Sequence, residues 1–250
     1  MIKIESINKS FGSKKVLHDF SANFESGKVN LIIGKSGSGK TMAIKCMLGL
    51  HEVDSGHIYF SNRDFINISA FKRQQIRKEI GMVFQGSALF DSMTIEENVM
   101  FPLLMSQTLS NSEMKKRVSF CLNRVALKNV NNLYPSELSG GMQKRVAIAR
   151  AISLNPKYLF CDEPNSGLDP TTASVIDSLL QEITYEYNIT TVINTHDMNS
   201  ALQIGDNIIF LNEGNFMWSG TKETLLNSKN NSLNKFIFSS EVFKKLKNKS

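Results

Sequence analysis

The sequence predicts an α/β fold, with an open sheet whose strands alternate with helices. Apolar runs at residues 28–34, 157–164 and 189–197 have the length and composition of buried strands. The last two end in polar groups, at the sheet edge where ligands of open α/β folds gather. A glycine-rich stretch, GKSGSGKT at residues 34–41, joins the first strand to a segment of helical spacing at 40–50. This order of elements indicates an α/β core with a glycine-rich loop at the edge of the sheet where ligands gather.

The remaining elements follow from spacing and end signals. Gly49 closes the first predicted helix, and Thr94 with Glu97 has the capping-box spacing of a helix start that Pro102 is expected to limit. Residues 207–220 are expected to form a hairpin that turns at Glu213-Gly214. A further helix is expected over 109–127, because its apolar residues share one face. They are Met114, Val118, Cys121, Leu122 and Val125.

Composition is typical of an ordinary globular protein. The 250 residues are 41% hydrophobic and 21% charged. No apolar run approaches the roughly 18 residues of a membrane span, and the first ten residues show no signal-peptide pattern. Cys46, Cys121 and Cys161 follow no metal-ligand spacing and are expected to be buried thiols.

The net charge of +6 is concentrated at the C-terminus. Residues 229–250 hold six lysines and one glutamate, which leaves 23 basic and 22 acidic side chains in the rest of the chain. A nearly neutral body argues against a nucleic-acid groove, which would spread positive charge over the folded surface. No nucleic-acid partner is therefore expected.

The stretch at 34–41 fits the phosphate-loop pattern G-x-x-x-x-G-K-[ST], in the strand-to-helix context that the pattern requires. Its backbone N–H groups and the following helix terminus are suited to phosphate oxygens. Lys40 is expected to reach the β- and γ-phosphates, and the Thr41 hydroxyl to bind Mg²⁺. The sequence therefore predicts binding of a nucleoside triphosphate by Gly34, Ser36, Gly37, Ser38, Gly39, Lys40 and Thr41.

Adjacent acids follow the strand predicted over residues 157–164. Asp162 at its tip is expected to hold the magnesium shell. Glu163, expected on the other face of the strand, is suited to orient or deprotonate the attacking water. These residues complete a candidate hydrolytic site.

With these motifs in place, residues 1–225 resemble an ATP-binding cassette (ABC) ATPase. Phe11 is similar to the aromatic residue that stacks on adenine, and Gln85 in GMVFQ to the glutamine that senses γ-phosphate and contributes to the metal site. Asp169 in SGLDP resembles the D-loop aspartate, and His196 in INTHD the switch histidine. LSGGMQ resembles the family signature, which contacts nucleotide through Ser139, Gly140 and Gly141. Asn165 departs from the more frequent Thr, and Phe11 from the more frequent Tyr.

The resemblance implies a P-loop NTPase fold of the ABC-ATPase type. It implies a RecA-like core with an N-terminal antiparallel β subdomain, within an ATPase domain at residues 1–226. An α-helical subdomain is expected at about residues 86–137, and a basic tail at residues 227–250.

The resemblance also answers why one chain carries two glycine loops. In the family two copies pair head to tail, and each ATP lies between one copy's phosphate loop and the partner's signature. Glu163, His196, Lys40 and Gln85 are the implied catalytic residues, with ATP and Mg²⁺ as cofactors. The implied partners are a second copy and integral membrane permease subunits, at the cytoplasmic face of the inner membrane.

Two other classes of ATPase are disfavoured. Only 52 residues separate Gln85 from Leu138, too few for the long coiled coil of chromosome-type relatives, and one cassette differs from the two of translation-type relatives. P-loop kinases and GTPases lack a signature, and Asn8-Lys9-Ser10-Phe11 fails the guanine pattern N-K-x-D. ATP-driven transport across a membrane is the expected function.

The cargo expectation depends on two short segments. VFQGSALFDSMTIEENVMFPL at residues 83–103 is similar to ATPases of MCE-type phospholipid transporters, the Mla group. NEGNFMWSGTKETLLNS at residues 212–228, followed by LNKFI at 233–237, is also similar to the hairpin and C-terminal region of that group. This resemblance implies lipid trafficking with a periplasmic MCE lipid-binding protein. The alternative is a small-solute importer of the amino acid or methionine type, followed by lipoprotein release or cell-division roles.

The tail has two interpretations. Its apolar residues are interleaved with lysines. They are Leu233, Phe236, Ile237 and, further on, Val242, Phe243 and Leu246. They predict a short helix that packs on the ATPase domain or on a second copy. Alternatively, the lysines lie against anionic headgroups, at about 1 kcal/mol each near the surface.

Overall fold

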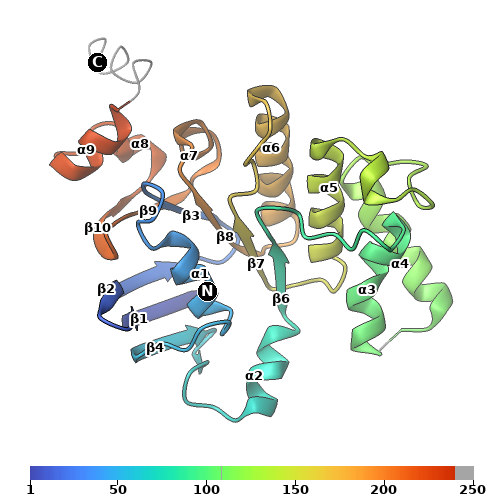
Figure 1. Cartoon of the computed structure of the whole chain (residues 1–250), viewed down its shortest axis with the longest axis horizontal. Coiled ribbons are helices and arrows are strands. Elements are labelled where there is room, and N and C mark those ends of the chain that lie inside the picture. The colour runs from blue at the N-terminus through green and yellow to red at the C-terminus, as the bar shows by residue number, and fades with distance from the viewer. Residues whose placement is uncertain (108, 240–250) are drawn as a thin grey trace.

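A computed structural model describes residues 1–107 and 109–239. Within them one mixed sheet runs through the molecule in the order β5-β4-β1-β2-β10-β9-β3-β8-β7-β6 (Figure 1). The strands are β1 Ile2–Phe11, β2 Lys14–Phe24, β3 Val29–Ile33, β4 Ser55–Phe60, β5 Arg63–Asp64, β6 Ile80–Val83, β7 Tyr158–Asp162, β8 Thr190–Thr195, β9 Asn207–Asn212 and β10 Asn215–Gly220. The helices are α1 Lys40–Met47, α2 Ala70–Arg77, α3 Ile95–Ser106, α4 Asn111–Arg124, α5 Gly140–Ala151, α6 Pro170–Glu186, α7 Met198–Ile204, α8 Lys222–Leu225 and α9 Asn231–Ile237, with a 3₁₀ turn at Pro135–Glu137.

The sheet has a parallel half and an antiparallel half. β9, β3, β8, β7 and β6 run parallel to one another. The antiparallel half consists of β1, β2, β4 and β5. β1 and β2 come before α1 in the chain, and β4 and β5 come after it. The parallel half brings the carboxyl ends of β3, β7 and β8 to the same edge, so the polar residues that follow them meet there.

Both faces of the parallel strands are covered by helices. Leu31 and Ile33 of β3 face the core that also holds Ile176 of α6, while Ile32 faces the core that holds Ile44 of α1. All five side chains of β3 are buried, as its continuous apolar sequence predicts. The strands predicted over 28–34, 157–164 and 189–197 are confirmed.

The predicted capping box at the start of α3 is confirmed. The Thr94 backbone N–H donates to Glu97 Oε2 at 2.7 Å, and the Glu97 N–H donates to Thr94 Oγ1 at 3.3 Å. The expectation that Pro102 limits the helix is wrong, because α3 continues to Ser106. Proline costs the helix one backbone hydrogen bond, but Leu103 beyond it is 1% exposed in the core, so packing outweighs that loss.

The other predicted elements are also found. The five apolar residues predicted for one face of the 109–127 helix are buried on and just after α4. The hairpin β9–β10 turns at Glu213 and Gly214, both with positive φ. α3, α4 and α5 stand together beyond β6, at the end of the molecule opposite the antiparallel strands (Figure 1).

α9 forms part of the predicted tail helix. Leu233, Phe236 and Ile237 are buried against the main core, and the Phe236 ring stacks on Phe210 of β9 with centroids 5.4 Å apart. Packing of this segment on the core of the same chain is therefore confirmed for residues 231–237. The later apolar residues, from Val242 onward, lie outside the described residues.

The three cysteines are free and buried, as expected. Burial raises the pKa of the Cys46 and Cys121 thiols to about 11 and also raises that of Cys161. Across residues 1–107 and 109–239, none of the helices has the length and hydropathy of a membrane span.

Candidate functional site

The phosphate loop leaves β3 and begins α1. Gly39 is the residue before the helix, with φ 103°, a conformation that favours glycine. A Cβ atom on Gly34 would lie 2.2 Å from the Leu211 carbonyl oxygen, so only glycine fits against β9 there. The loop backbone is thus shaped by glycines at the positions that the sequence pattern requires.

Lys40 is held at the centre of this loop. Its Nζ donates to the carbonyl oxygens of Gly34 and Lys35, both at 2.9 Å. Burial lowers the pKa of Lys40, while Glu163 and Asp162 oppose that shift. The Ser38 hydroxyl is buried and has no hydrogen-bond partner in the described part of the chain. A buried cation and a buried donor without a partner fit an anionic phosphate ligand.

The two residues predicted to hold Mg²⁺ lie together. The Thr41 hydroxyl donates to Asp162 Oδ1 at 3.1 Å, although 120 residues lie between them in the chain. Hydroxyl and carboxylate oxygens are hard ligands of the kind that Mg²⁺ prefers. This pair therefore fits the ion, whereas the Gln85 side chain lies with other partners.

Gln85 and His196 lie on either side of Glu163. Gln85 Nε2 donates to Glu163 Oε2 and to Ser166 Oγ, both at 3.3 Å, and His196 Nδ1 lies 3.1 Å from Glu163 Oε1. Glu163 has φ 45° and follows the last residue of β7, so strand alternation does not set its direction. The fold thus gathers three of the four predicted catalytic side chains.

α5 positions the glutamine loop through two cations that the sequence analysis did not single out. Lys144 Nζ donates to the Gln85 carbonyl oxygen. Arg150 donates to the carbonyl oxygens of Ser87 and Ala88 at 2.8 and 2.7 Å. The helix that begins at the signature is therefore tied to the loop that carries Gln85.

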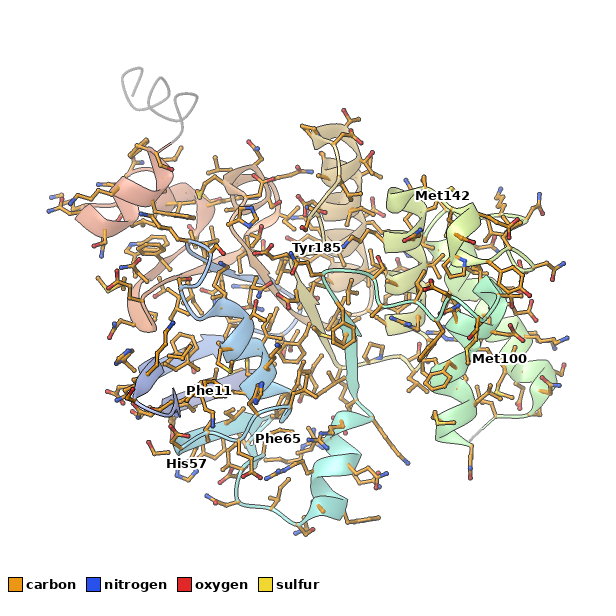
Figure 2. All side chains as sticks on the ribbon, in the orientation of Figure 1. Phe11, His57, Phe65, Met100, Met142 and Tyr185 are labelled. Carbon is orange, nitrogen blue, oxygen red and sulfur yellow. The ribbon has the colours of Figure 1, made fainter. Side chains whose placement is uncertain are left out.

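The signature itself lies apart from the phosphate loop of the same chain. Ser139 caps α5 by accepting from the Met142 N–H at 3.3 Å, and Gly140 and Gly141 form its first turn. α5 packs on α3, α4, α6 and β6, whereas α1 packs on β2, β7 and β8. In Figure 1, α1 and α5 lie on opposite sides of β7, so the two glycine loops that begin these helices lie apart in one chain. Figure 2 shows Met142, in the first turns of α5, at the side of the molecule away from Phe11.

Phe11 and Asp169 have other neighbours in the single chain. Phe11, at the end of β1, is 45% exposed and makes an edge contact with His51, with centroids 5.4 Å apart. Asp169 caps α6 by accepting from the Thr171 and Thr172 N–H groups at 3.0 Å. Their nucleotide roles stay predictions.

A buried polar cluster lies behind the D-loop. Asn165 Nδ2 donates to Asp177 Oδ1 of α6 at 2.7 Å and lies 3.3 Å from Ser200 Oγ. Asp177 is 2% exposed, and burial raises its pKa to about 6. Asp177 was missed from sequence because a lone acid on a helix has no distinguishing local signal.

We expect Asp177 to make stability depend on pH. Its folded pKa of about 6 is above the ordinary 3.8, so the stability from its protonated form is lost as pH rises through about 6. Asp177→Asn removes this titration. The variant should gain about 1 kcal/mol relative to wild type between about pH 5 and about pH 7.5, measured by urea unfolding. Exposed Asp91→Asn is the control, and an equal difference at both pH values for Asp177→Asn would contradict the expectation.

Comparisons with known proteins agree with this geometry. The profile of the ABC transporter family matches residues 17–166. The methionine import ATP-binding protein MetN of Clostridioides difficile (strain 630) is 38% identical over 237 residues, which cover 95% of this chain and 74% of that protein. The "probable ribonucleotide transport ATP-binding protein mkl" of Mycobacterium leprae (strain TN) is 36% identical over 227 residues, 91% of this chain and 65% of that protein.

Two solved structures share the fold. The ATP-binding cassette MJ0796, a dimer in a post-hydrolysis state bound to ADP and Pi, has a TM-score of 0.81 and 33% identity, over 89% of this chain and 99% of that one. CbiO1 of Clostridium perfringens, part of the ABC transporter complex cbiONQ, has a TM-score of 0.84 and 29% identity over 98% of both chains. The predicted ABC-ATPase fold is confirmed.

Proposed function

Because this chain belongs to the ABC transporter family of ATPases, we propose that it works as an ATP-driven homodimer that powers a membrane permease for a small solute. ATP hydrolysis by an ATP-binding transporter subunit is what family membership establishes. The dimer, the permease and the solute are the proposed parts.

The separation of the two glycine loops carries the dimer proposal. Ser139 and the first turn of α5 lie away from α1 in the same chain. A signature that contacts nucleotide therefore needs a second copy facing the phosphate loop. The dimeric state of the solved MJ0796 cassette supports this arrangement.

Within the proposed dimer the described residues divide the reaction between them. Lys40 and the loop amides hold the phosphates, and Glu163 accepts the proton of the attacking water. His196 and Gln85, both within hydrogen-bond reach of Glu163, keep its carboxylate oriented. Mg²⁺ held by Thr41 and Asp162 would supply neutralisation of phosphate charge. Loss of γ-phosphate then removes the shared ligand, and the dimer reopens.

An exposed apolar groove supports docking of a permease. It lies between β6 and α3 and is lined by Ile80, Phe84, Phe90, Phe101, Pro102 and Leu154. Phe84 is 39% exposed and Phe90 41%. Gln85 directly follows Phe84, so a helix seated in the groove would be linked to the γ-phosphate sensor.

For the cargo we propose methionine or a similar small polar solute. The comparisons favour this alternative over lipid trafficking, because the first of the relatives is a methionine import protein and the second is named for ribonucleotide transport. The resemblance of residues 83–103 and 212–237 is the basis of the MCE-type lipid expectation. Neither of the two relatives reported above is named for lipid transport or for an MCE protein.

We expect deletion of this chain to abolish high-affinity methionine uptake in its native cells. The measurement is uptake of radiolabelled methionine, with the wild-type chain and Lys40→Ala restored in parallel. Rescue by wild type alone supports the proposal.

Normal methionine uptake in the deletion strain would refute the proposal that methionine is the transported solute. Affinity purification of the tagged chain from solubilised membranes, with mass spectrometry of bound molecules, separates the alternatives. A phospholipid together with an MCE-domain protein would restore the lipid interpretation, while the absence of any polytopic membrane protein would refute the permease.

A further inference from the structure

Asn194 is a buried amide in the middle of the sheet. It is 0% exposed and lies on β8 opposite Asp162 of β7 and Ile32 of β3. On the same face of β8, Val192 packs in the core. A buried amide is costly unless its donors and acceptor are paired, so its partners show what it stabilises.

All of its side-chain partners belong to the hydrolytic site. Asn194 Nδ2 donates to Asp162 Oδ1 at 2.7 Å and to Thr41 Oγ1 at 3.2 Å. Asn194 Oδ1 accepts from the Glu163 N–H at 2.8 Å. One side chain therefore contacts both residues that fit Mg²⁺ and the backbone of the predicted base.

These contacts orient the carboxylate of Asp162. Oδ1 accepts from both the Thr41 hydroxyl and the Asn194 amide. No hydrogen bond from the described residues reaches Oδ2, which leaves this oxygen to the metal shell. The Asn194 amide thus fixes the rotation of the carboxylate.

The same side chain fixes the turn at Glu163. The left-handed backbone of Glu163, with φ 45°, is unfavourable for a residue with a Cβ atom. Its N–H is held by both the main-chain oxygen of Asn194, at 3.1 Å, and Oδ1. This double contact keeps the Glu163 side chain beside Gln85 and His196.

We propose that Asn194 is a positioning residue of the magnesium–ATP site, which sets metal affinity through Asp162 and Thr41 and the placement of the base through Glu163. The inference rests on the ATPase site and is independent of the cargo. Sequence reasoning missed it because one Asn before Thr-His has no motif of its own.

The test replaces Asn194 with Leu, which has similar volume and no donor, and with Ser, which keeps one hydroxyl. The matched control is Asn30→Leu on β3. Asn30 is also 0% exposed, but its amide donates to the carbonyl oxygens of Glu25, Lys28 and Thr191, away from the phosphate loop. Both Leu variants remove one buried amide from the same sheet.

Metal binding is measured without turnover, as free Mn²⁺ by electron paramagnetic resonance in the presence of a non-hydrolysable ATP analogue. Groups that orient metal ligands typically contribute about 10- to 100-fold to metal affinity. We expect Mn²⁺ affinity to fall at least tenfold in Asn194→Leu, to be intermediate in Asn194→Ser, and to stay within about twofold of wild type in Asn30→Leu. The affinity for the ATP analogue without metal, measured in EDTA, should stay within about twofold of wild type in all three variants.

Wild-type Mn²⁺ affinity in both Asn194 variants would overturn the inference. So would an equal loss in Asn30→Leu, which would show that any buried amide on this sheet has the same effect. If Asn194→Leu does not fold, as judged by its thermal transition, Asn194→Ser decides alone. Wild-type protein with no metal-dependent binding of the analogue would overturn the site assignment itself, and this inference with it.

Discussion

Replacing Glu163 by glutamine is expected to lower ATP hydrolysis by at least about a hundredfold while ATP binding persists. A general base contributes about 10²- to 10⁴-fold, and an amide of the same shape cannot accept the proton of water. Because γ-phosphate is retained, the dimer should accumulate with ATP bound. Phosphate release measures the first effect, and size-exclusion chromatography with light scattering measures the second.

The matched control is Glu182→Gln, on the outer part of α6. Its carboxylate is 64% exposed and pairs with Arg124 at 3.4 Å, away from the phosphate loop. Glu182→Gln should hydrolyse ATP at the wild-type rate. Its distribution between monomer and dimer should equal that of the wild type. Hydrolysis by Glu163→Gln at the same rate as this control would refute the assignment of the base.

The second large effect is expected for Lys40→Ala. Hydrogen bonds to charged groups contribute about 1.5–3 kcal/mol, so losing the Lys40 ammonium should weaken ATP binding by about 10- to 100-fold. Desolvation already disfavours the buried charge, as the lowered pKa of Lys40 indicates, so the nucleotide-free fold should keep its stability. The increase in thermal transition temperature that Mg²⁺–ATP causes in the wild type should shrink accordingly, by about 1.4–2.7 kcal/mol of ligand stabilisation.

Lys45→Ala in the last turn of the same helix is the control for this experiment. It tests whether any lysine of α1 would have the same effect. A Lys40→Ala protein that keeps the full ATP-dependent shift would contradict the predicted contact with phosphate. A loss of the nucleotide-free transition would instead show that Lys40 holds the fold.

The sequence predicted those elements that depend on residues only a few positions apart. The phosphate loop depends on glycines at fixed positions after an apolar strand. Gly34 lies too close to the Leu211 carbonyl oxygen for any side chain, and Gly39 has a positive φ that favours glycine. The Thr94–Glu97 cap likewise needs two residues three apart. Pro102 shows the limit of local propensity, because the burial of Leu103 keeps the helix intact beyond it.

The short segments and the whole chain resemble different transporters. Residues 83–103 resemble one group, whereas the methionine import protein of Clostridioides difficile is 38% identical over 95% of this chain. This segment lines the groove where we expect the permease, so it reports on docking more directly than on the transported molecule.

The sequence by itself determined the α/β core, the phosphate loop, the acid pair at the end of β7 and the family. Each of these is specified by neighbours in the chain. Only the tertiary structure decided that Asn194 contacts Thr41 and Asp162, that Lys144 holds Gln85 and that Asp177 lies buried behind the D-loop. These contacts join residues 12 to 153 positions apart, on strands and helices whose order in the sheet differs from their order in the chain. A single polar residue has no local pattern that names such a partner, because only packing of the parallel strands and their helices brings the two together.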